Sequence, residues 1–204
     1  VSLIEGFIGD LPLQCFAIDF QRGGYLDYEA AVSSAMDTDP MIPLKMSDAF
    51  NLIYSSGTTG TPKGILHNHQ MRSAQMDRVS PSGYDDNART LISTPLYSNT
   101  TIVSFIPTLF GGSTVHLMPK FDARGYLEIV EREKITHTML VPVQYKRIME
   151  VADFDSFDLS SMRVKFSTSA PLRADVKRDV LARFPGKLLE YYGLTEGGGV
   201  TVLA

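Results

Sequence analysis

The sequence is poor in cysteine and contains no long uninterrupted apolar run. Its single cysteine, Cys15, excludes a disulfide within the chain and a cysteine-based metal cluster. This favours a reducing compartment, and we therefore expect a cytoplasmic location. The stretch nearest to a membrane span, 102–110, is interrupted by Ser104, Pro107 and Thr108, whereas a spanning helix needs about 18 consecutive apolar residues. No transmembrane segment is predicted.

Positive charge is also scarce, because 19 Lys and Arg residues stand against 23 Asp and Glu residues and give a formal net charge of −4. A chain without a basic field has no electrostatic support for a nucleic-acid partner, so any phosphate binding must be local. Hydrophobic residues make up 44% of the 204 residues, which is enough for the core of one large domain or two small ones. The chain begins at Val1 without the features of a signal peptide, and we expect a piece of a longer protein.

The most informative motif is a hydroxyl-rich glycine loop, which reads Y-S-S-G-T-T-G-T-P-K-G over residues 54–64. Glycines allow backbone N–H groups to turn toward an anion, the hydroxyls add donors, and Lys63 adds a positive charge. Pro62 and Gly64 flank that lysine where the common P-loop has glycine and a hydroxyl residue, so the motif is a different one. The loop predicts a site for a nucleoside triphosphate. The alternative is a solvated Ser/Thr/Gly linker.

Short β-rich segments alternate with amphipathic segments from about residue 50 onward. Strands are expected at 51–55, 65–68, 90–94, 113–118, 135–141, 163–167 and 187–191. Helices are expected at 69–79, 100–110, 122–134, 142–152 and 172–184. The first 50 residues are less regular, with a strand expected at 15–20 and a helix at 28–36. The alternation predicts an α/β fold with a mostly parallel sheet covered by helices, and ligands at the carboxyl ends of its strands.

A second motif, Y-G-L-T-E at residues 192–196, follows the last expected strand. Together the two motifs resemble the adenylate-forming (AMP-binding) superfamily, which includes acyl-CoA synthetases, luciferases and peptide-synthetase adenylation domains. The segments P-L-Y-S at 95–98 and S-A-P-L at 169–172 are similar to that family's P-L-F-H and G-A-P-L segments. The resemblance is strongest to fatty-acid and aryl-acid CoA ligases. It implies that 45–204 form an AMP-binding core subdomain and that 1–44 are an incomplete leading part of the large N-terminal domain.

The resemblance also implies roles for individual residues. Contacts to the ATP phosphates are implied for Ser56, Gly57, Thr58, Thr59, Gly60 and Lys63. A border around the adenine is implied for Ser169, Ala170, Pro171, Tyr192 and Gly193. Thr195 would contact the α-phosphate and Glu196 would bind Mg²⁺, which with Lys63 makes the catalytic set. Tyr97, Ser98, Asn99 and Gly197 would line the substrate pocket.

The implied reaction joins a small carboxylic acid to ATP as an acyl-adenylate and then transfers the acyl group to coenzyme A. The acid is the nucleophile, so no protein nucleophile is required. Two residues depart from the family pattern, because Ser98 stands where histidine or an aromatic residue is common and Ser169 stands where glycine is usual. The glycines that follow Glu196 predict either additional pocket volume or a flexible turn.

The family's ribose-binding aspartate and its C-terminal lysine-bearing domain are absent from the sequence, so we expect the isolated chain to be inactive. Two alternatives remain open: a peptide-synthetase-type or luciferase-like enzyme, and a non-catalytic nucleotide-binding or scaffold fragment. The identity of the acid and the oligomeric state are not predicted. The triplet His67-Asn68-His69 superficially suggests metal ligands, but a strand-to-helix junction explains it more simply.

Overall fold

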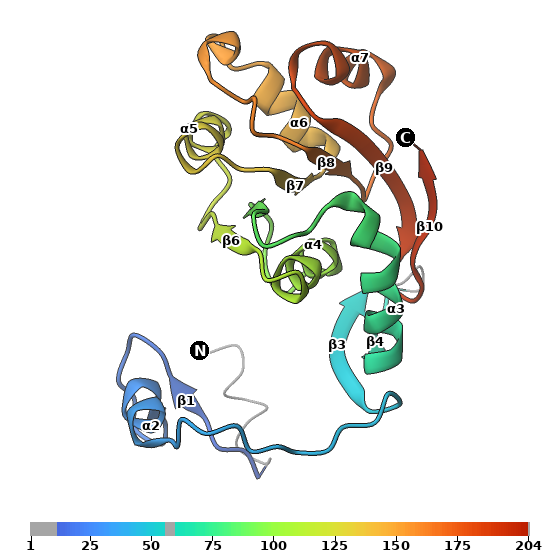
Figure 1. Ribbon diagram of the computed structural model, residues 1–204. Coiled ribbons are helices and arrows are strands. Elements are labelled where there is room, and N and C mark those ends of the chain that lie inside the picture. The colour runs from blue at the N-terminus through green and yellow to red at the C-terminus, as the bar shows by residue number, and fades with distance from the viewer. Residues whose placement is uncertain (1–11, 56–59, 204) are drawn as a thin grey trace. The chain divides into compact units, whose positions relative to one another are not determined.

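The computed structural model describes residues 12–55 and 60–203, and its chain divides into two compact units, 1–43 and 44–204 (Figure 1). In the first unit, strands β1 (Phe16–Ala17) and β2 (Leu26–Asp27) form a short parallel pair. Helix α2 (Tyr28–Ser34) begins where the Asp27 carboxylate accepts a hydrogen bond from the Ala30 N–H at 2.8 Å. The strand expected at 15–20 is thus only two residues long, and β2 was not predicted.

The second unit is built on a six-stranded sheet in the order β10-β9-β8-β7-β5-β6. Its strands are β5 (Arg89–Ile92), β6 (Thr114–Leu117), β7 (His137–Leu140), β8 (Val164–Ser167), β9 (Lys187–Leu194) and β10 (Gly198–Leu203). Every pair in this sheet is parallel except β10 with β9. The prediction of an α/β fold with a mostly parallel sheet is confirmed.

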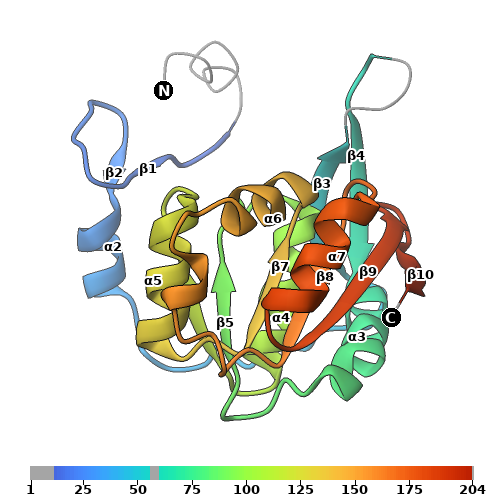
Figure 2. The ribbon, with the colours of Figure 1, turned by 90° about the horizontal axis from the view of Figure 1, so that it is seen from above.

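Helices cover both faces of the sheet (Figures 1 and 2). One face carries α3 (His69–Val79) and α4 (Asn99–Phe110). The other face carries α5 (Ala123–Glu133), α6 (Pro142–Met149) and α7 (Ala174–Arg183). Two short 3-10 helices, η1 (Ser80–Ser82) and η2 (Phe154–Ser156), lie in the connections. Because the central strands β7 and β8 lie between two helical layers, all of their residues are buried.

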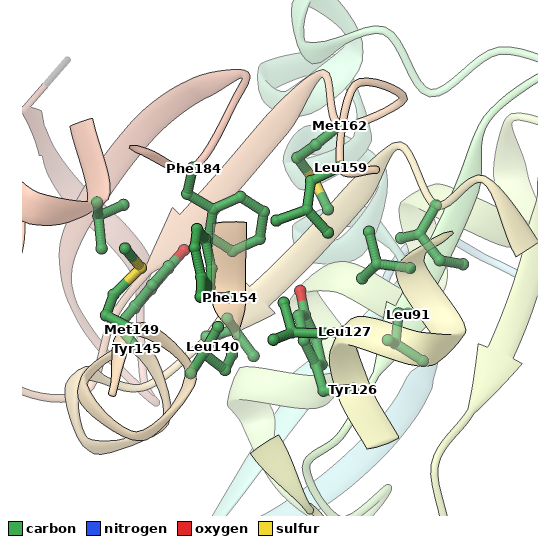
Figure 3. Close-up of a cluster of buried hydrophobic side chains, with 14 of the residues drawn as sticks. Leu91, Tyr126, Leu127, Leu140, Tyr145, Met149, Phe154, Leu159, Met162 and Phe184 are labelled. Atoms are coloured by element: carbon green, nitrogen blue, oxygen red, sulfur yellow. The ribbon is translucent and has the colours of Figure 1, made fainter. Parts of the chain in front are cut away.

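The main hydrophobic core fills the space between the sheet and helices α5, α6 and α7 (Figure 3). Its labelled members are Leu91, Tyr126, Leu127, Leu140, Tyr145, Met149, Phe154, Leu159, Met162 and Phe184. Successive strand residues point to opposite faces, so Leu140 joins this core while its neighbour Met139 belongs to a smaller cluster with Val164 and Phe166. The sheet therefore separates a large core from a small one.

A β-hairpin precedes the main sheet and forms a separate antiparallel pair. Its strands are β3 (Ala49–Ser55) and β4 (Lys63–Asn68), with Ser55 opposite Lys63. Both strands are longer than predicted, and Lys63 lies within β4. Asn68 then caps α3 by accepting a hydrogen bond from the Met71 N–H at 2.9 Å. The hairpin thus connects the glycine loop directly to the helix that follows it.

Strand β10 corrects one prediction about the glycines after Glu196. Gly198 and Gly199 belong to this strand and pair with Leu194 and Gly193 of β9, so these two glycines are not part of a flexible turn. The turn itself occupies only 195–197. In the part of the chain that the structure describes, no helix is both long and apolar enough to cross a membrane.

Candidate functional site

Three connecting segments meet beyond the carboxyl ends of parallel strands. Residues 93–98 follow β5, 168–171 follow β8, and 195–197 follow β9. The start of α4, which follows the first segment, contacts the second segment where the hydroxyl of Thr100 lies 2.9 Å from the hydroxyl of Ser169. This is the edge at which open parallel sheets usually bind their ligands, and it is where the sequence predicted the site.

A cavity of about 440 Å³ opens at this edge and runs between α3, α4 and the sheet. Five of the residues predicted for the site line it: Asn99, Ser169, Gly193, Thr195 and Gly197. The other described residues predicted for the site do not belong to its lining; they are Gly60, Lys63, Tyr97, Ser98, Ala170, Pro171, Tyr192 and Glu196. Tyr97 and Tyr192 are 82% and 66% exposed. The cavity lining thus includes two of the four residues predicted for the acid, Asn99 and Gly197, and three of those predicted for ATP, Ser169, Gly193 and Thr195.

Aromatic side chains cluster in one part of the cavity lining. Tyr84, Phe166 and Tyr191 all line it. The Tyr84 ring lies parallel to Phe166 at 6.2 Å and stacks at 4.5 Å on His137, and Phe166 packs against Tyr191 at 5.7 Å. Burial raises the pKa of Tyr84 well above its usual value, so its hydroxyl stays protonated. This part of the cavity therefore suits an uncharged, apolar group.

Helix α3 supplies one wall that sequence reasoning missed. Met71, Gln75, Arg78 and Val79 line the cavity at helical spacing. The spacing was visible in the sequence, but which helix face meets a cavity depends on packing against α4 and the β3–β4 hairpin. Met139 of β7 was missed for the same reason, because it lay within an expected buried strand with no signal to show that it faces a ligand.

The glycine loop is described only at its ends. Ser56, Gly57, Thr58 and Thr59 lie outside the described residues, and their assignment to the ATP phosphates stays a prediction. Gly60 has a φ of 82°, a conformation that glycine adopts without strain. Lys63 is exposed at the start of β4. An exposed ammonium at the foot of the loop is available for an anionic ligand.

The turn after β9 presents the predicted metal ligand to solvent. Thr195 is half-buried and lines the cavity, whereas Glu196 beside it is exposed. Among the described residues no group of three or more His, Cys, Asp or Glu side chains is arranged to hold a metal ion. A lone exposed carboxylate still suits Mg²⁺, which usually keeps several waters and binds one or two carboxylates together with substrate phosphates. The donor set fits a magnesium ion that arrives with a nucleotide.

Ser169 has a φ of 75°, in the left-handed region where glycine is favoured. The structure thus gives a backbone reason for the glycine that the family commonly has there. The contact between the Ser169 and Thr100 hydroxyls offsets part of the cost of this backbone conformation.

The triplet at 67–69 is confirmed as a strand-to-helix junction, because β4 ends at Asn68 and α3 begins at His69. His67 points inward, and its Nε2 donates to the Thr195 carbonyl at 2.6 Å.

Comparison with known proteins identifies one family and several similar structures. A family model described as AMP-binding enzyme matches residues 11–204. A curated relative, 4-coumarate–CoA ligase 2 of Nicotiana tabacum, is 31% identical over 210 residues, which cover 100% of this chain and 39% of the relative. The inhibitor-bound N-terminal domain of FACL13 from Mycobacterium tuberculosis has a TM-score of 0.79 and 25% identity over 86% of this chain and 44% of that chain. ATP-bound MatB from Rhodopseudomonas palustris has a TM-score of 0.78 and 29% identity over 86% of this chain and 35% of that chain.

Proposed function

The chain belongs to the AMP-binding enzyme family, and from this we propose that the full-length protein activates a carboxylic acid with ATP and transfers the acyl group to coenzyme A. The chain spans 39% of the length of the 4-coumarate–CoA ligase named above. The observation that carries the proposal is the cavity at the carboxyl edge of the sheet, whose lining combines the polar residues Asn99, Ser169 and Thr195 with aromatic rings. Such a cavity can hold an apolar acid with its carboxylate near the nucleotide.

In the proposed first step, a carboxylate oxygen of the acid attacks the α-phosphorus of ATP. The bond between the α- and β-phosphates breaks, and pyrophosphate leaves with the bonding electrons. Lys63 and the glycine loop hold the departing phosphates, and the Thr195 hydroxyl donates to the α-phosphate. Glu196 would hold Mg²⁺, which supplies positive charge to the phosphates.

In the proposed second step, the thiol of coenzyme A loses its proton and attacks the carbonyl carbon of the acyl-adenylate. The bond between that carbon and the phosphate oxygen breaks, and AMP leaves. The printed names of curated relatives, which are CoA ligases, support this choice of acceptor.

The cavity also supports a substrate class. Its volume of about 440 Å³ falls in the range of roughly 300–1,000 Å³ that small-molecule pockets occupy. Tyr84, Met139, Phe166 and Val103 give it an apolar lining. We expect an aromatic acid or an aliphatic acid of medium length, because a small polar acid would leave this apolar surface in contact with water.

The test is ATP–pyrophosphate exchange by the full-length protein with short, medium, long and aromatic acids. Lys63→Ala and Glu196→Ala should each lower exchange with the best acid by about 100-fold or more, because each removes charge stabilisation from the transition state. Lys146→Ala and Glu150→Ala are matched controls, since this exposed ion pair joins α6 to the residue that caps its C-terminus. Unchanged exchange in the two site variants, or no exchange with any acid, would overturn the proposal. Release of AMP only when coenzyme A is added would identify the acceptor.

A further inference from the structure

Arg72 is a buried guanidinium in helix α3, only 3% exposed, and its hydrogen-bonding partners are uncharged. Its Nε donates to Asn51 Oδ1 at 3.0 Å and its Nη1 to Gln75 Oε1 at 2.8 Å. Its Nη2 donates to His67 Nδ1 at 2.8 Å and to Asn99 Oδ1 at 3.1 Å. Within 12–55 and 60–203, no carboxylate forms an ion pair with it. Burying a cation costs free energy because the charge loses its water. Here four neutral acceptors, and no carboxylate, replace that water.

The contact with Arg72 determines the protonation of His67. A guanidinium has only donors, so the Nδ1 atom of His67 must accept its hydrogen bond. The side-chain amide nitrogen of Asn51 lies 3.3 Å from the same Nδ1 and can donate to it as well. The ring is therefore neutral with its hydrogen on Nε2, and that hydrogen is donated to the Thr195 carbonyl at 2.6 Å. Burial acts in the same direction by lowering the pKa of His67 below its usual value.

This network joins three parts of the site that are far apart in the sequence. Asn51 and His67 belong to the hairpin that carries the glycine loop. Gln75 and Asn99 line the cavity from α3 and α4. Thr195 lines the same cavity and precedes Glu196. One guanidinium thus contacts the hairpin and the cavity wall directly and reaches the turn of Thr195 and Glu196 through a single imidazole.

We propose that Arg72 and His67 are positioning residues for adenylate formation. Arg72 fixes the tautomer and orientation of His67, and His67 holds the Thr195 carbonyl so that Thr195 and Glu196 face the phosphates held by the glycine loop. The same guanidinium orients Asn99 in the cavity wall. The inference rests on the proposed function for its catalytic consequence, but the tautomer and the contacts stand independently of it.

The first experiment replaces His67 in the full-length protein in two ways and measures pyrophosphate exchange. His67→Phe keeps a ring but removes both hydrogen bonds, and it should lower kcat by about 10- to 100-fold, as is typical when a group that orients a ligand is lost. His67→Gln can accept from Arg72 through its oxygen and donate to Thr195 through its nitrogen, so it should restore most of the rate. The contacts that run from Arg72 through His67 to Thr195 form a relay. Because this relay positions groups that act in the transition state, kcat should change more than the KM for the acid.

Arg72→Met should resemble His67→Phe, and Arg72→Lys should rescue it poorly because a single ammonium cannot reproduce the planar fork. Arg132→Met is the matched control, since Arg132 lies on α5 and pairs with Glu133 at the surface. Equal rates for His67→Phe, His67→Gln and the wild-type protein would overturn the proposal. So would a wild-type rate in Arg72→Met, whose side chain is neutral and cannot donate a hydrogen bond.

The second experiment needs no activity. Nitrogen NMR of histidine-labelled wild-type protein at neutral pH should show His67 as a neutral ring with its hydrogen on Nε2, and Arg72→Met should change that signal. A hydrogen on Nδ1, or a doubly protonated ring, would overturn the relay even if the enzyme is active. If the NMR result holds but no acid supports exchange, the relay's contacts stand, and the proposed function and the relay's catalytic role fail.

Discussion

The two faces of the main sheet differ in what they bury. Toward α5, α6 and α7 the sheet contributes Leu91, Leu140 and Leu188 to a large apolar core. Toward α3 and α4 it contributes Met139 and Phe166, which border the cavity. Side chains one residue apart in β7 therefore have different surroundings: Leu140 packs in the large core, and Met139 lines the cavity.

The largest expected effect tests whether stability is concentrated on the core face. Leu127 of α5 is fully buried in the large core, so Leu127→Ala should lower the free energy of unfolding by about 3 kcal/mol. Leu194→Ala is the comparison on the cavity face, where the side chain is 55% exposed, and it should cost less than about 1 kcal/mol. Urea denaturation measures both. Equal losses of unfolding free energy in the two variants would contradict the expectation that stability is concentrated on the core face.

A smaller effect is expected at the one charged side chain on the core face of β8. Lys165 is fully buried, and its ammonium donates to the carbonyls of Phe184, Pro185 and Gly186 beyond α7. Lys165→Met should cost about 2 kcal/mol, because it leaves these carbonyls without their donor while removing the cost of a buried charge. Lys146→Met, at an exposed position on α6, should change stability by less than about 0.5 kcal/mol. If Lys165→Met raises the free energy of unfolding, the buried charge destabilises the core.

The smallest effect is expected at Ser169 on the cavity face. Ser169→Gly relieves the positive φ but loses the contact with the Thr100 hydroxyl. The net gain in the free energy of unfolding should be under about 1 kcal/mol. Thr100→Val removes the same hydroxyl contact without changing the backbone, so the difference between the two variants isolates the strain. A loss of stability in Ser169→Gly larger than that in Thr100→Val would show that the backbone at this turn is not strained.

The order of strands and helices could be predicted from the sequence because the apolar periodicities of the second unit are regular. The boundaries were less accurate where a distant group intervenes. Helix α7 was expected from residue 172 but begins at Ala174, and the preceding segment is held by the Leu172 N–H, which donates to the Glu190 carboxylate at 2.8 Å. Strand β10 was missed because it begins with two glycines, which have low strand propensity, and its formation depends on pairing with β9.

The candidate site was predictable where motifs mark it and not where packing creates it. Thr195, Ser169 and Asn99 were identified from segments at strand ends, and they line one cavity. Nothing in the sequence indicated Arg72, because a single arginine in a polar helix is expected to be exposed. Its burial depends on Asn51 and Asn99, which accept its hydrogen bonds. His67 was predicted only as part of a junction, since its partner at Thr195 is 128 residues away in the sequence.

Helix α3 carries ligand-facing residues on one side and the Arg72 anchor on another. Because a helix moves as a rigid rod, any shift of its axis that widens the cavity also pulls on the hairpin at Asn51 and His67. Shortening a side chain such as Met71 therefore enlarges the cavity without moving the hairpin, whereas displacing the helix moves the cavity wall and the hairpin together.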